Sequence, residues 1–285
     1  MTQGPTAQGD KRVGSLIQVP DPVLMGILNV TPDSFSDGGE FFGVKPATVQ
    51  AEKMLDEGAH MIDVGGESTR PGSDPVSPEE ELRRVFPVVR GILESRPETK
   101  ISIDTYRAST AETALDAGAR VVNDVTALRG DPRMAGLVAE RGCPVVLMHM
   151  LGEPKSMQRD PRYENVVREV RDFLVSRVEY AISAGVREEN VILDPGIGFG
   201  KTLRHNLELL NGLNVFVELG FFVLVGASRK SFLGKILGSD ATGDRLFGTV
   251  ATNVIAYERG ATLFRVHDIR ANKEALEVAA AVRRV

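Results

Sequence analysis

Polar residues end several apolar segments of this chain in a way that suggests shared chemistry. Asp104, Asn123 and Asp194 close the segments ISIDT, VVNDV and VILDPG. A carboxylate inside an apolar run is costly unless it is paired or hydrogen-bonded, and several at corresponding positions favour a ligand site. Carboxylates and amides that point into one cavity suit a flat heterocycle carrying N–H donors. Asp63, in the middle of MIDVGGE, is explained equally well by a structural role.

Cations gather at the ends of the last two apolar segments. Lys230 follows FFVLVGAS, and Arg265 and His267 lie in LFRVHD. Guanidinium groups bind phosphate through two hydrogen bonds, and lysine adds a point charge. We therefore expect an anionic substrate group here, although the formal net charge of the chain is −5.

The segment DPGIGFGKT, Asp194–Thr202, looks like a phosphate loop but is not a Walker A motif. Pro195 stands where that motif requires glycine. Its glycines predict a backbone that lies close to a ligand. Phe199 then either covers the face of a ring or packs as an ordinary apolar side chain.

The elements that must position these residues are eight short apolar segments, each followed by a helix-like stretch. Eight such units in 285 residues predict an α/β fold, a closed (β/α)8 TIM barrel in a single domain. We expect the barrel over residues 21–285, after an N-terminal tail and lead-in at 1–20. Active sites lie at the C-terminal strand ends of such barrels. The segments are Val23–Val30, Met61–Glu67, Ile101–Thr105, Val121–Val125, Pro144–His149, Val191–Gly196, Phe221–Ser228 and Leu263–Asp268.

Helix signals and loops separate these segments. Ser77 followed by Pro78 and three acidic residues predicts a helix start. Two long connections, Thr31–Lys45 and Ser68–Ser77, are rich in Gly, Pro, Ser and Asp and are therefore predicted loops. Long loops on the catalytic face of a barrel are often lids.

Composition excludes several classes of protein. The negative net charge opposes nucleic-acid binding. No apolar run approaches the ~18 residues of a membrane span, and the first twenty residues lack the apolar core of a secretory signal. We expect a cytoplasmic protein without membrane or nucleic-acid partners. The single cysteine, Cys143, is expected to be a buried apolar residue.

The histidines show no metal-cage spacing. His60, His149, His205 and His267 fit neither an HExxH motif nor a Cys/His motif, and the chain has no G-x-S-x-G nucleophile. A Mg²⁺ ion held mainly by substrate phosphates and one side chain remains compatible with the sequence.

Seven segments together resemble the dihydropteroate synthase family of folate biosynthesis, and they occur in the family order. They are MGILNVTPDSFSDGG (25–39), DVGGESTRPG (63–72), SIDT (102–105), VNDV (122–125), DPGIGFGK (194–201), GASRKS (226–231) and RVHD (265–268). The resemblance implies a (β/α)8 barrel. It also implies condensation of 6-hydroxymethyl-7,8-dihydropterin pyrophosphate with p-aminobenzoate, which gives 7,8-dihydropteroate and pyrophosphate.

The resemblance also implies residue roles. The pterin would be bound by Asp104, Asn123, Met148, Asp194, Phe199 and Lys230, and the pyrophosphate by Asn29, Thr69, Arg70, Arg265 and His267. Phe35, Pro71 and Ser231 would bind p-aminobenzoate, and Asn29 would lie near Mg²⁺. The catalytic residues would be Asp33, Asp104, Arg70 and Lys230. The family often forms homodimers, and sulfonamides mimic its p-aminobenzoate.

Three other functions compete with this interpretation. A pterin-binding methyltransferase domain shares the barrel and the carboxylates but does not need Arg70 or Lys230. A non-catalytic pterin-binding homologue would lose loop residues, yet Asn29 and Asp33 are present. A Schiff-base aldolase would use a lysine at a strand end, but the motifs around the lysines belong to the first family.

Overall fold

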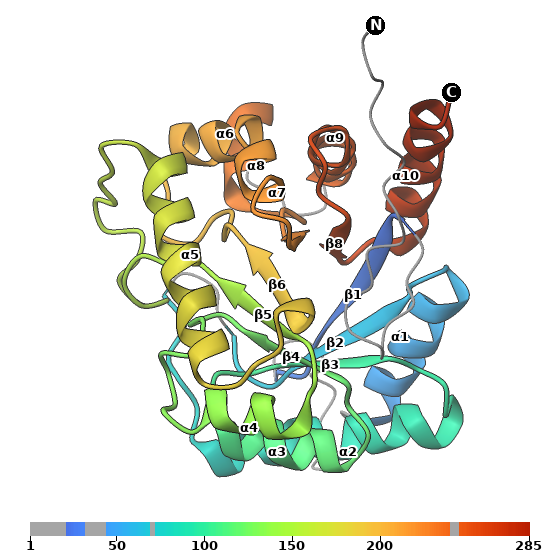
Figure 1. Cartoon of the computed structure of the whole chain (residues 1–285). Coiled ribbons are helices and arrows are strands. Elements are labelled where there is room, and N and C mark those ends of the chain that lie inside the picture. The colour runs from blue at the N-terminus through green and yellow to red at the C-terminus, as the bar shows by residue number, and fades with distance from the viewer. Residues whose placement is uncertain (1–20, 32–43, 69–71, 240–244) are drawn as a thin grey trace, which may run out of the picture.

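The structure, a computed structural model, describes residues 21–31, 44–68, 72–239 and 245–285. Eight parallel strands form a closed barrel in chain order, with β1 paired to β8 (Figure 1). The predicted (β/α)8 fold is confirmed, while the predicted tail at 1–20 lies outside the described residues. The strands are β1 (Val23–Asn29), β2 (Met61–Gly65), β3 (Ile101–Asp104), β4 (Val121–Asp124), β5 (Val145–Met148), β6 (Val191–Asp194), β7 (Phe222–Val225) and β8 (Leu263–Val266).

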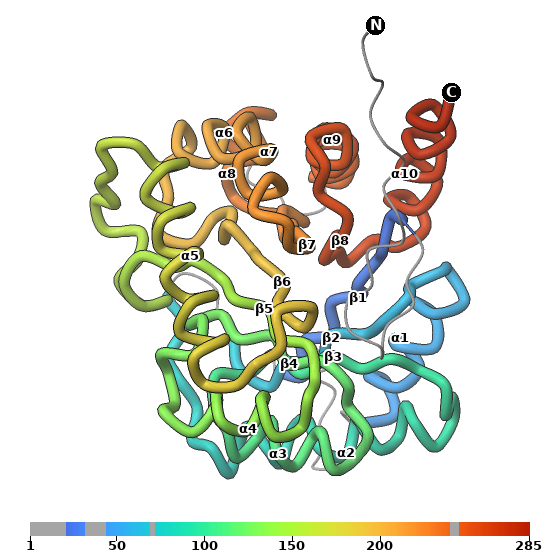
Figure 2. The backbone as a smooth tube through the Cα atoms, viewed as in Figure 1, coloured from blue at the N-terminus to red at the C-terminus, as the bar shows by residue number. Residues whose placement is uncertain are grey.

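Helices surround this barrel on its outside, as the backbone trace shows (Figure 2). Two helices follow β6 and two follow β7, and a short 3₁₀ turn at Glu188–Asn190 precedes β6. The helices are α1 (Val44–Asp56), α2 (Pro78–Ser95), α3 (Ala108–Asp116), α4 (Met134–Arg141), α5 (Val166–Ser183), α6 (Leu203–Asn211), α7 (Asn214–Val217), α8 (Ser231–Leu237), α9 (Leu246–Glu258) and α10 (Ile269–Arg283).

The start of α2 follows its sequence signal. The Ser77 hydroxyl accepts a hydrogen bond from the backbone N–H of Glu80 at 3.2 Å, with Pro78 in the first turn. Side-chain caps of this kind satisfy an N–H group that has no partner within the helix. Within the part of the chain that the structure describes, no helix is both long and apolar enough to cross a membrane.

The interior of the barrel has an apolar layer below a polar one. The apolar layer consists of Val23, Met25, Met61, Val121, Val146, Ile192, Leu224 and Leu263. Side chains alternate between the two faces of a strand, so the residue two positions later also points inward. That residue is Asp63, Asn123, Met148, Asp194 or Arg265 on five of the strands. The strand pairing aligns Asp104 with Asn123 and Met148 with Asp194, which places the polar layer at the C-terminal strand ends.

The observed strands end earlier than the predicted ones. The seventh segment was expected over Phe221–Ser228, for example, but the ladder runs only from Phe222 to Val225. The polar residues that follow leave the ladder and enter loops, where their side chains and backbone groups find other partners. This shortening leaves the active-site face where it was expected.

Candidate active site

An arginine between two carboxylates forms the centre of the polar layer. Arg265 donates from Nε to Asp63 Oδ2 at 2.6 Å and from Nη2 to Asp104 Oδ2 at 2.7 Å. Asp63 is fully buried, and the exposed fraction of Asp104 is 8%. A buried charge is tolerated only when it is paired in this way. The three residues come from β2, β3 and β8, so the pairing holds together strand ends that are far apart in the sequence.

Asn123 joins this centre through Asp63. Its Nδ2 donates to Asp63 Oδ2 at 3.1 Å, and both side chains are buried. A carboxylate can only accept, so this contact fixes which way the amide points and leaves the amide oxygen available as an acceptor. Asp63 therefore has the structural role that was one of its two predicted explanations. It positions Asn123 and Arg265 from below.

The two carboxylates predicted to bind the heterocycle, Asp104 and Asp194, are costly to bury in their charged forms. Burial raises the pKa of Asp104, the Arg265 charge opposes this, and the Asp63 charge adds to it. Burial likewise raises the pKa of Asp194 to about 6. The hydrogen bond from the backbone N–H of Gly196 and the charges of Lys230, Lys201 and Arg265 lower it and so reduce this rise. A carboxylate that is costly to bury in its charged form is stabilised when a ligand supplies N–H donors.

A buried cluster of methionine and aromatic side chains lies beside these carboxylates. Met148 and Phe199 belong to one buried cluster, with Val125, Met150 and Met157. The Lys230 ammonium lies 3.9 Å from the centroid of the Phe199 ring. Cation–π contacts of this kind hold both groups in place. Phe199 therefore does more than pack, because it orients a cation that the sequence predicted for the site.

The loop after β7 is tied to the end of β8. Arg229 donates from Nε to Asp268 at 2.9 Å and forms a second bond to the same carboxylate. Its backbone lies in the left-handed region with φ of 56°, which is unusual for a residue other than glycine. Ser228 Oγ lies 2.9 Å from His267 Nδ1. These contacts fix the backbone that carries Lys230 and His267.

The remaining predicted residues divide into two groups. Asn29 ends β1 and is half-buried, while Ser231 begins α8 and is exposed. The other predicted residues lie outside the described residues, so their placement stays a prediction. They are Asp33, Phe35, Thr69, Arg70 and Pro71.

The donors present fit a magnesium ion that arrives with its substrate. Among the described residues, no three His, Cys, Asp or Glu side chains gather closely enough to enclose a metal. Mg²⁺ is commonly bound by one or two protein oxygens together with substrate phosphates and water. The Asn29 amide oxygen, at a strand end of the active-site face, is a donor of that kind.

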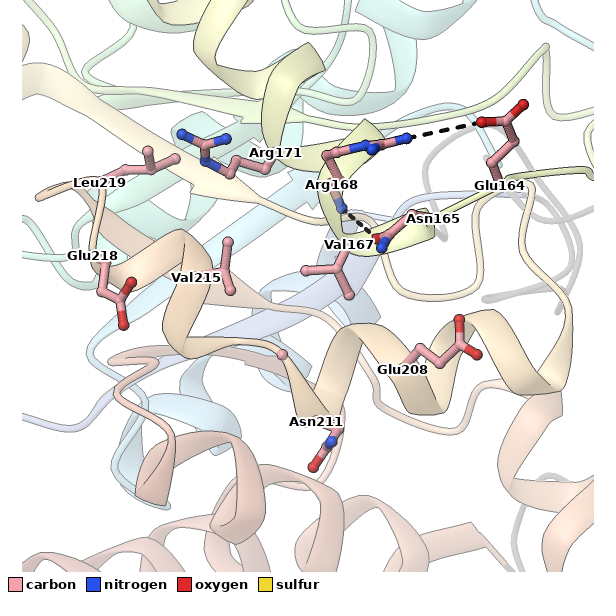
Figure 3. Close-up of a pocket in the computed structure, with 11 residues that line it drawn as sticks. Glu164, Asn165, Val167, Arg168, Arg171, Glu208, Asn211, Val215, Glu218 and Leu219 are labelled. Carbon is pink, nitrogen blue, oxygen red and sulfur yellow. Dashed lines mark hydrogen bonds and ion pairs between the residues drawn. The ribbon is translucent and has the colours of Figure 1, made fainter.

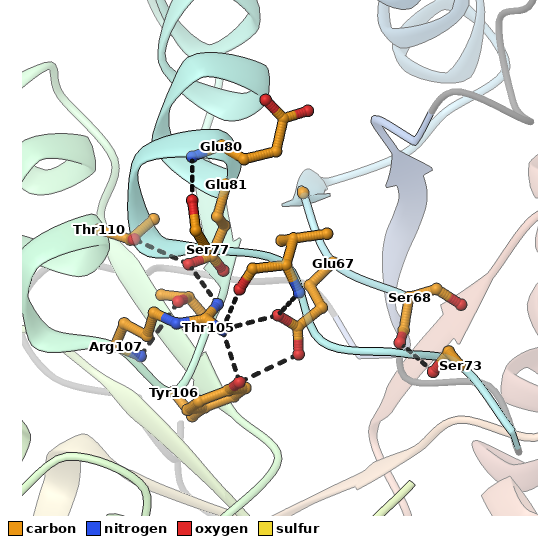
Figure 4. Close-up of polar contacts among 12 residues, drawn as sticks. Glu67, Ser68, Ser73, Ser77, Glu80, Glu81, Thr105, Tyr106, Arg107 and Thr110 are labelled. Atoms are coloured by element: carbon orange, nitrogen blue, oxygen red, sulfur yellow. Dashed lines mark hydrogen bonds and ion pairs between the residues drawn. The ribbon is translucent and has the colours of Figure 1, made fainter. Parts of the chain in front are cut away.

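Sequence reasoning missed a charged cluster that joins the described ends of the connection after β2 (Figure 4). The Arg107 guanidinium donates to Glu67 at 2.8 Å, to Glu81 at 2.9 Å and to the Val76 carbonyl at 2.7 Å. The Tyr106 hydroxyl donates to Glu67 at 3.1 Å. Arg107 thus joins the start of the connection, its end and α2. The sequence predicted Glu81 only as an acidic residue in the first turn of a helix. In the structure its exposed fraction is 1%.

A separate hollow lies outside the barrel, between α5, α6 and α7 (Figure 3). Its volume is about 860 Å³, and its lining includes Glu164, Arg168, Arg171, Glu208 and Glu218. None of the residues predicted for the site lines it. The polar layer at the barrel mouth therefore remains the candidate site.

Comparison with known proteins agrees with this geometry. A family model described as pterin binding enzyme matches residues 25–267. The dihydropteroate synthase of Haemophilus influenzae is 46% identical over 257 residues, which cover 90% of this chain and 92% of that protein.

Solved structures are similar over the same extent. Xanthomonas albilineans dihydropteroate synthase with 4-aminobenzoic acid superimposes with a TM-score of 0.88 at 44% identity, covering 93% of this chain and 94% of that one. The same enzyme in complex with 7,8-dihydropteroate gives a TM-score of 0.84 at 42% identity, covering 93% and 95%. The chain belongs to the pterin binding enzyme family.

Proposed function

We propose that this chain is a dihydropteroate synthase. It joins 6-hydroxymethyl-7,8-dihydropterin pyrophosphate to p-aminobenzoate and releases pyrophosphate and 7,8-dihydropteroate. The single observation that carries the proposal is the polar layer at the barrel mouth, in a chain that is 46% identical to a dihydropteroate synthase over 257 residues. Carboxylates for ring N–H groups and cations for a diphosphate lie on neighbouring strand ends there.

The pterin ring would bind in the polar layer. Asp194 and Asp104 accept hydrogen bonds from its N–H groups, Asn123 offers an amide oxygen, and Met148 and Phe199 line the ring. Lys230, held over Phe199, completes this set. Such hydrogen bonds to charged groups contribute about 1.5 to 3 kcal/mol each, which is enough to orient the ring against water.

The diphosphate would lie toward Arg265, His267 and Asn29. The contacts of Arg265 with Asp63 and Asp104 use two of the N–H groups that a guanidinium carries, so it has further donors for phosphate oxygens. Thr69 and Arg70 are proposed to join them. Mg²⁺ held by Asn29 and the phosphates would neutralise charge on the leaving group.

The displacement is dissociative. The bond between the pterin methylene carbon and the diphosphate oxygen breaks, and its electron pair leaves with pyrophosphate. The resulting cation is delocalised into the ring, and the Asp104 and Asp33 carboxylates stabilise it electrostatically. The neutral amine of p-aminobenzoate, held by Phe35, Pro71 and Ser231, then forms the C–N bond and loses a proton to water. No strong base is required.

The competing functions have less support. A methyltransferase domain would share the polar layer, but the relatives reported above are dihydropteroate synthases. A pyrophosphate-release assay with the purified chain separates the candidates. We expect release from the pterin pyrophosphate that depends on p-aminobenzoate and is inhibited competitively by a sulfonamide. Pterin binding without such release would support the non-catalytic homologue instead.

We also propose a homodimer. Large apolar side chains stand exposed on three adjacent helices, α6, α8 and α9, and the exposed fraction of Phe247 reaches 82%. The others are Leu207, Ile236, Leu237 and Ile255. Clustered exposed apolar residues commonly mark association surfaces, and a twofold dimer would bury this surface against its own copy.

A further inference from the structure

Lys201 is a buried cation that the proposed mechanism does not use. Its exposed fraction is 3%. Its ammonium nitrogen lies 3.0 Å from His149 Nδ1, 3.3 Å from the His149 carbonyl and 3.0 Å from the Phe199 carbonyl. All three contacts are to atoms at the end of β5 or in the turn after β6.

The geometry fits the charged form of this lysine. An ammonium has three N–H donors, and Lys201 has three acceptors around it. Burial lowers the pKa of His149 to about 2, so its ring is neutral and Nδ1 can accept. Burial also lowers the pKa of Lys201 to about 7, while the Asp194 charge opposes this. The two backbone carbonyls can only accept, and His149 Nδ1 accepts in the tautomer that carries its proton on Nε2.

The contacts of Lys201 hold the turn that carries two predicted pterin contacts. The turn begins at Asp194, whose carbonyl accepts from the backbone N–H of His149 at 3.0 Å. Phe199, five residues farther along the turn, has its carbonyl bound to Lys201 and its ring under Lys230. Lys201 thus joins the turn to the residue that follows β5, and it holds Phe199 through the backbone carbonyl while Lys230 contacts the ring.

Lys201 also places positive charge near the Asp194 carboxylate. The groups that act on Asp194 are the backbone N–H of Gly196, Lys230 before α8, Lys201 after β6 and Arg265 on β8. His149, on the adjoining β5 end, is neutral. Loss of one of the three cations leaves Asp194 harder to ionise, because burial already disfavours its charge.

We propose that Lys201 is a positioning residue for the pterin, holding Phe199 in place through its carbonyl and favouring the ionised form of Asp194. The proposal rests on the proposed function, since it assigns Lys201 to the pterin half of that site. The proposal predicts that substitution of Lys201 weakens pterin binding and leaves p-aminobenzoate binding unchanged.

Two substitutions separate the two parts of this role. Lys201→Met removes the donors and the charge, whereas Lys201→Gln removes the charge and keeps N–H donors for the carbonyl groups. Lys53→Met, at an exposed lysine on α1, is the matched control. Each variant is tested for folding by circular dichroism, for pterin affinity by calorimetry between about pH 5.5 and 8.5, and for both KM values.

We expect Lys201→Met to weaken pterin binding about tenfold or more, the effect of one lost charge-assisted hydrogen bond. We expect its KM for p-aminobenzoate to stay near that of the wild type. Lys201→Gln should bind pterin like the wild type at high pH. As the pH is lowered, its pterin affinity should begin to fall at a higher pH than that of the wild type.

A folded Lys201→Met that binds pterin like the wild type at every pH would overturn the proposal. If Lys201→Met does not fold, the proposal is overturned when the pterin affinity of Lys201→Gln falls at the same pH as that of the wild type. Wild-type protein that releases no pyrophosphate would instead count against the proposed function, so the two failures can be told apart.

Discussion

Neighbouring groups assign different roles to aspartates of the same polar layer. Asp63 accepts from Arg265 and Asn123 and is fully buried, so it serves the fold of the site. Asp194 has a backbone N–H of Gly196 at 2.7 Å and cations nearby, and its charged form remains costly. A ligand with N–H donors relieves that cost. Asp194 is therefore the carboxylate of these two that we expect to contact substrate.

This difference gives a pH dependence for pterin binding. Burial raises the pKa of Asp194 to about 6, and the acceptor form is the ionised one. The carboxylate is ionised above that pKa and protonated below it, so affinity should be constant near pH 8 and fall as pH drops through about 6. Asp194→Asn should bind weakly at all pH values, losing about 1.5 to 3 kcal/mol, and should lose most of the pH dependence.

Calorimetric titration of a pterin at a series of pH values measures this effect. Asp116→Asn, at the exposed end of α3, is the control and should follow the wild-type curve. Undiminished affinity in Asp194→Asn would remove this carboxylate from the site.

The turn after β6 depends on glycine for steric reasons. Gly196 has φ of +69°, and a Cβ at this position would lie 1.9 Å from the His149 carbonyl oxygen. That oxygen belongs to backbone and cannot move aside cheaply. The turn that carries Phe199 therefore needs glycine here.

Gly196→Ala is expected to displace the turn and to lose pterin binding together with stability. Gly136→Ala on α4 is the matched control, because its Cβ would meet nothing within 4 Å. The control should stabilise the protein by about 0.5 to 1 kcal/mol. Thermal unfolding and pterin titration test both variants. Equal behaviour of the two would contradict the steric argument.

The charged cluster beside α2 stabilises the fold by joining α2 and the residues after β2 to the residues before α3. Arg107 contacts Glu67 and Glu81, whose side chains are 9% and 1% exposed. Arg107→Met leaves both acids without this partner, so the free energy of unfolding should fall by about 3 to 5 kcal/mol. Arg90→Met, in an exposed pair with Glu94, should change it by less than about 1 kcal/mol. Denaturant unfolding compares them, and a similar loss in both would refute the assignment.

Local pattern was enough to predict the strands, but not the contacts among strand ends. Asp104, Asn123 and Asp194 could be selected because each ends an apolar segment. The role of Asp63 could not be decided, because it depends on Arg265, which lies 202 positions away. Lys201 and Arg107 carried no signal of burial in the sequence, since surface cations are far more common. Only the closed barrel brings their acceptors together.

At the scale of the whole molecule, the apolar surface on α6, α8 and α9 predicts self-association. The wild-type chain should sediment as a dimer at micromolar concentration. Phe247→Asp should shift it toward the monomer, because a charge would be buried in the interface. Val49→Asp, 62% exposed on α1, should leave the dimer intact. A wild-type monomer, or equal dissociation of both variants, would contradict the proposed surface.

The barrel as a whole has a mouth and an outer hollow, and only one of them should bind substrate. The most direct measurement is a crystal structure of the chain with a pterin bound. We predict a ring at the barrel mouth, with its N–H groups about 2.7 to 3.2 Å from acceptors on Asp194, Asp104 or Asn123 and its face against Met148. A pterin bound between α5, α6 and α7, or one that leaves these side chains untouched, would contradict the account.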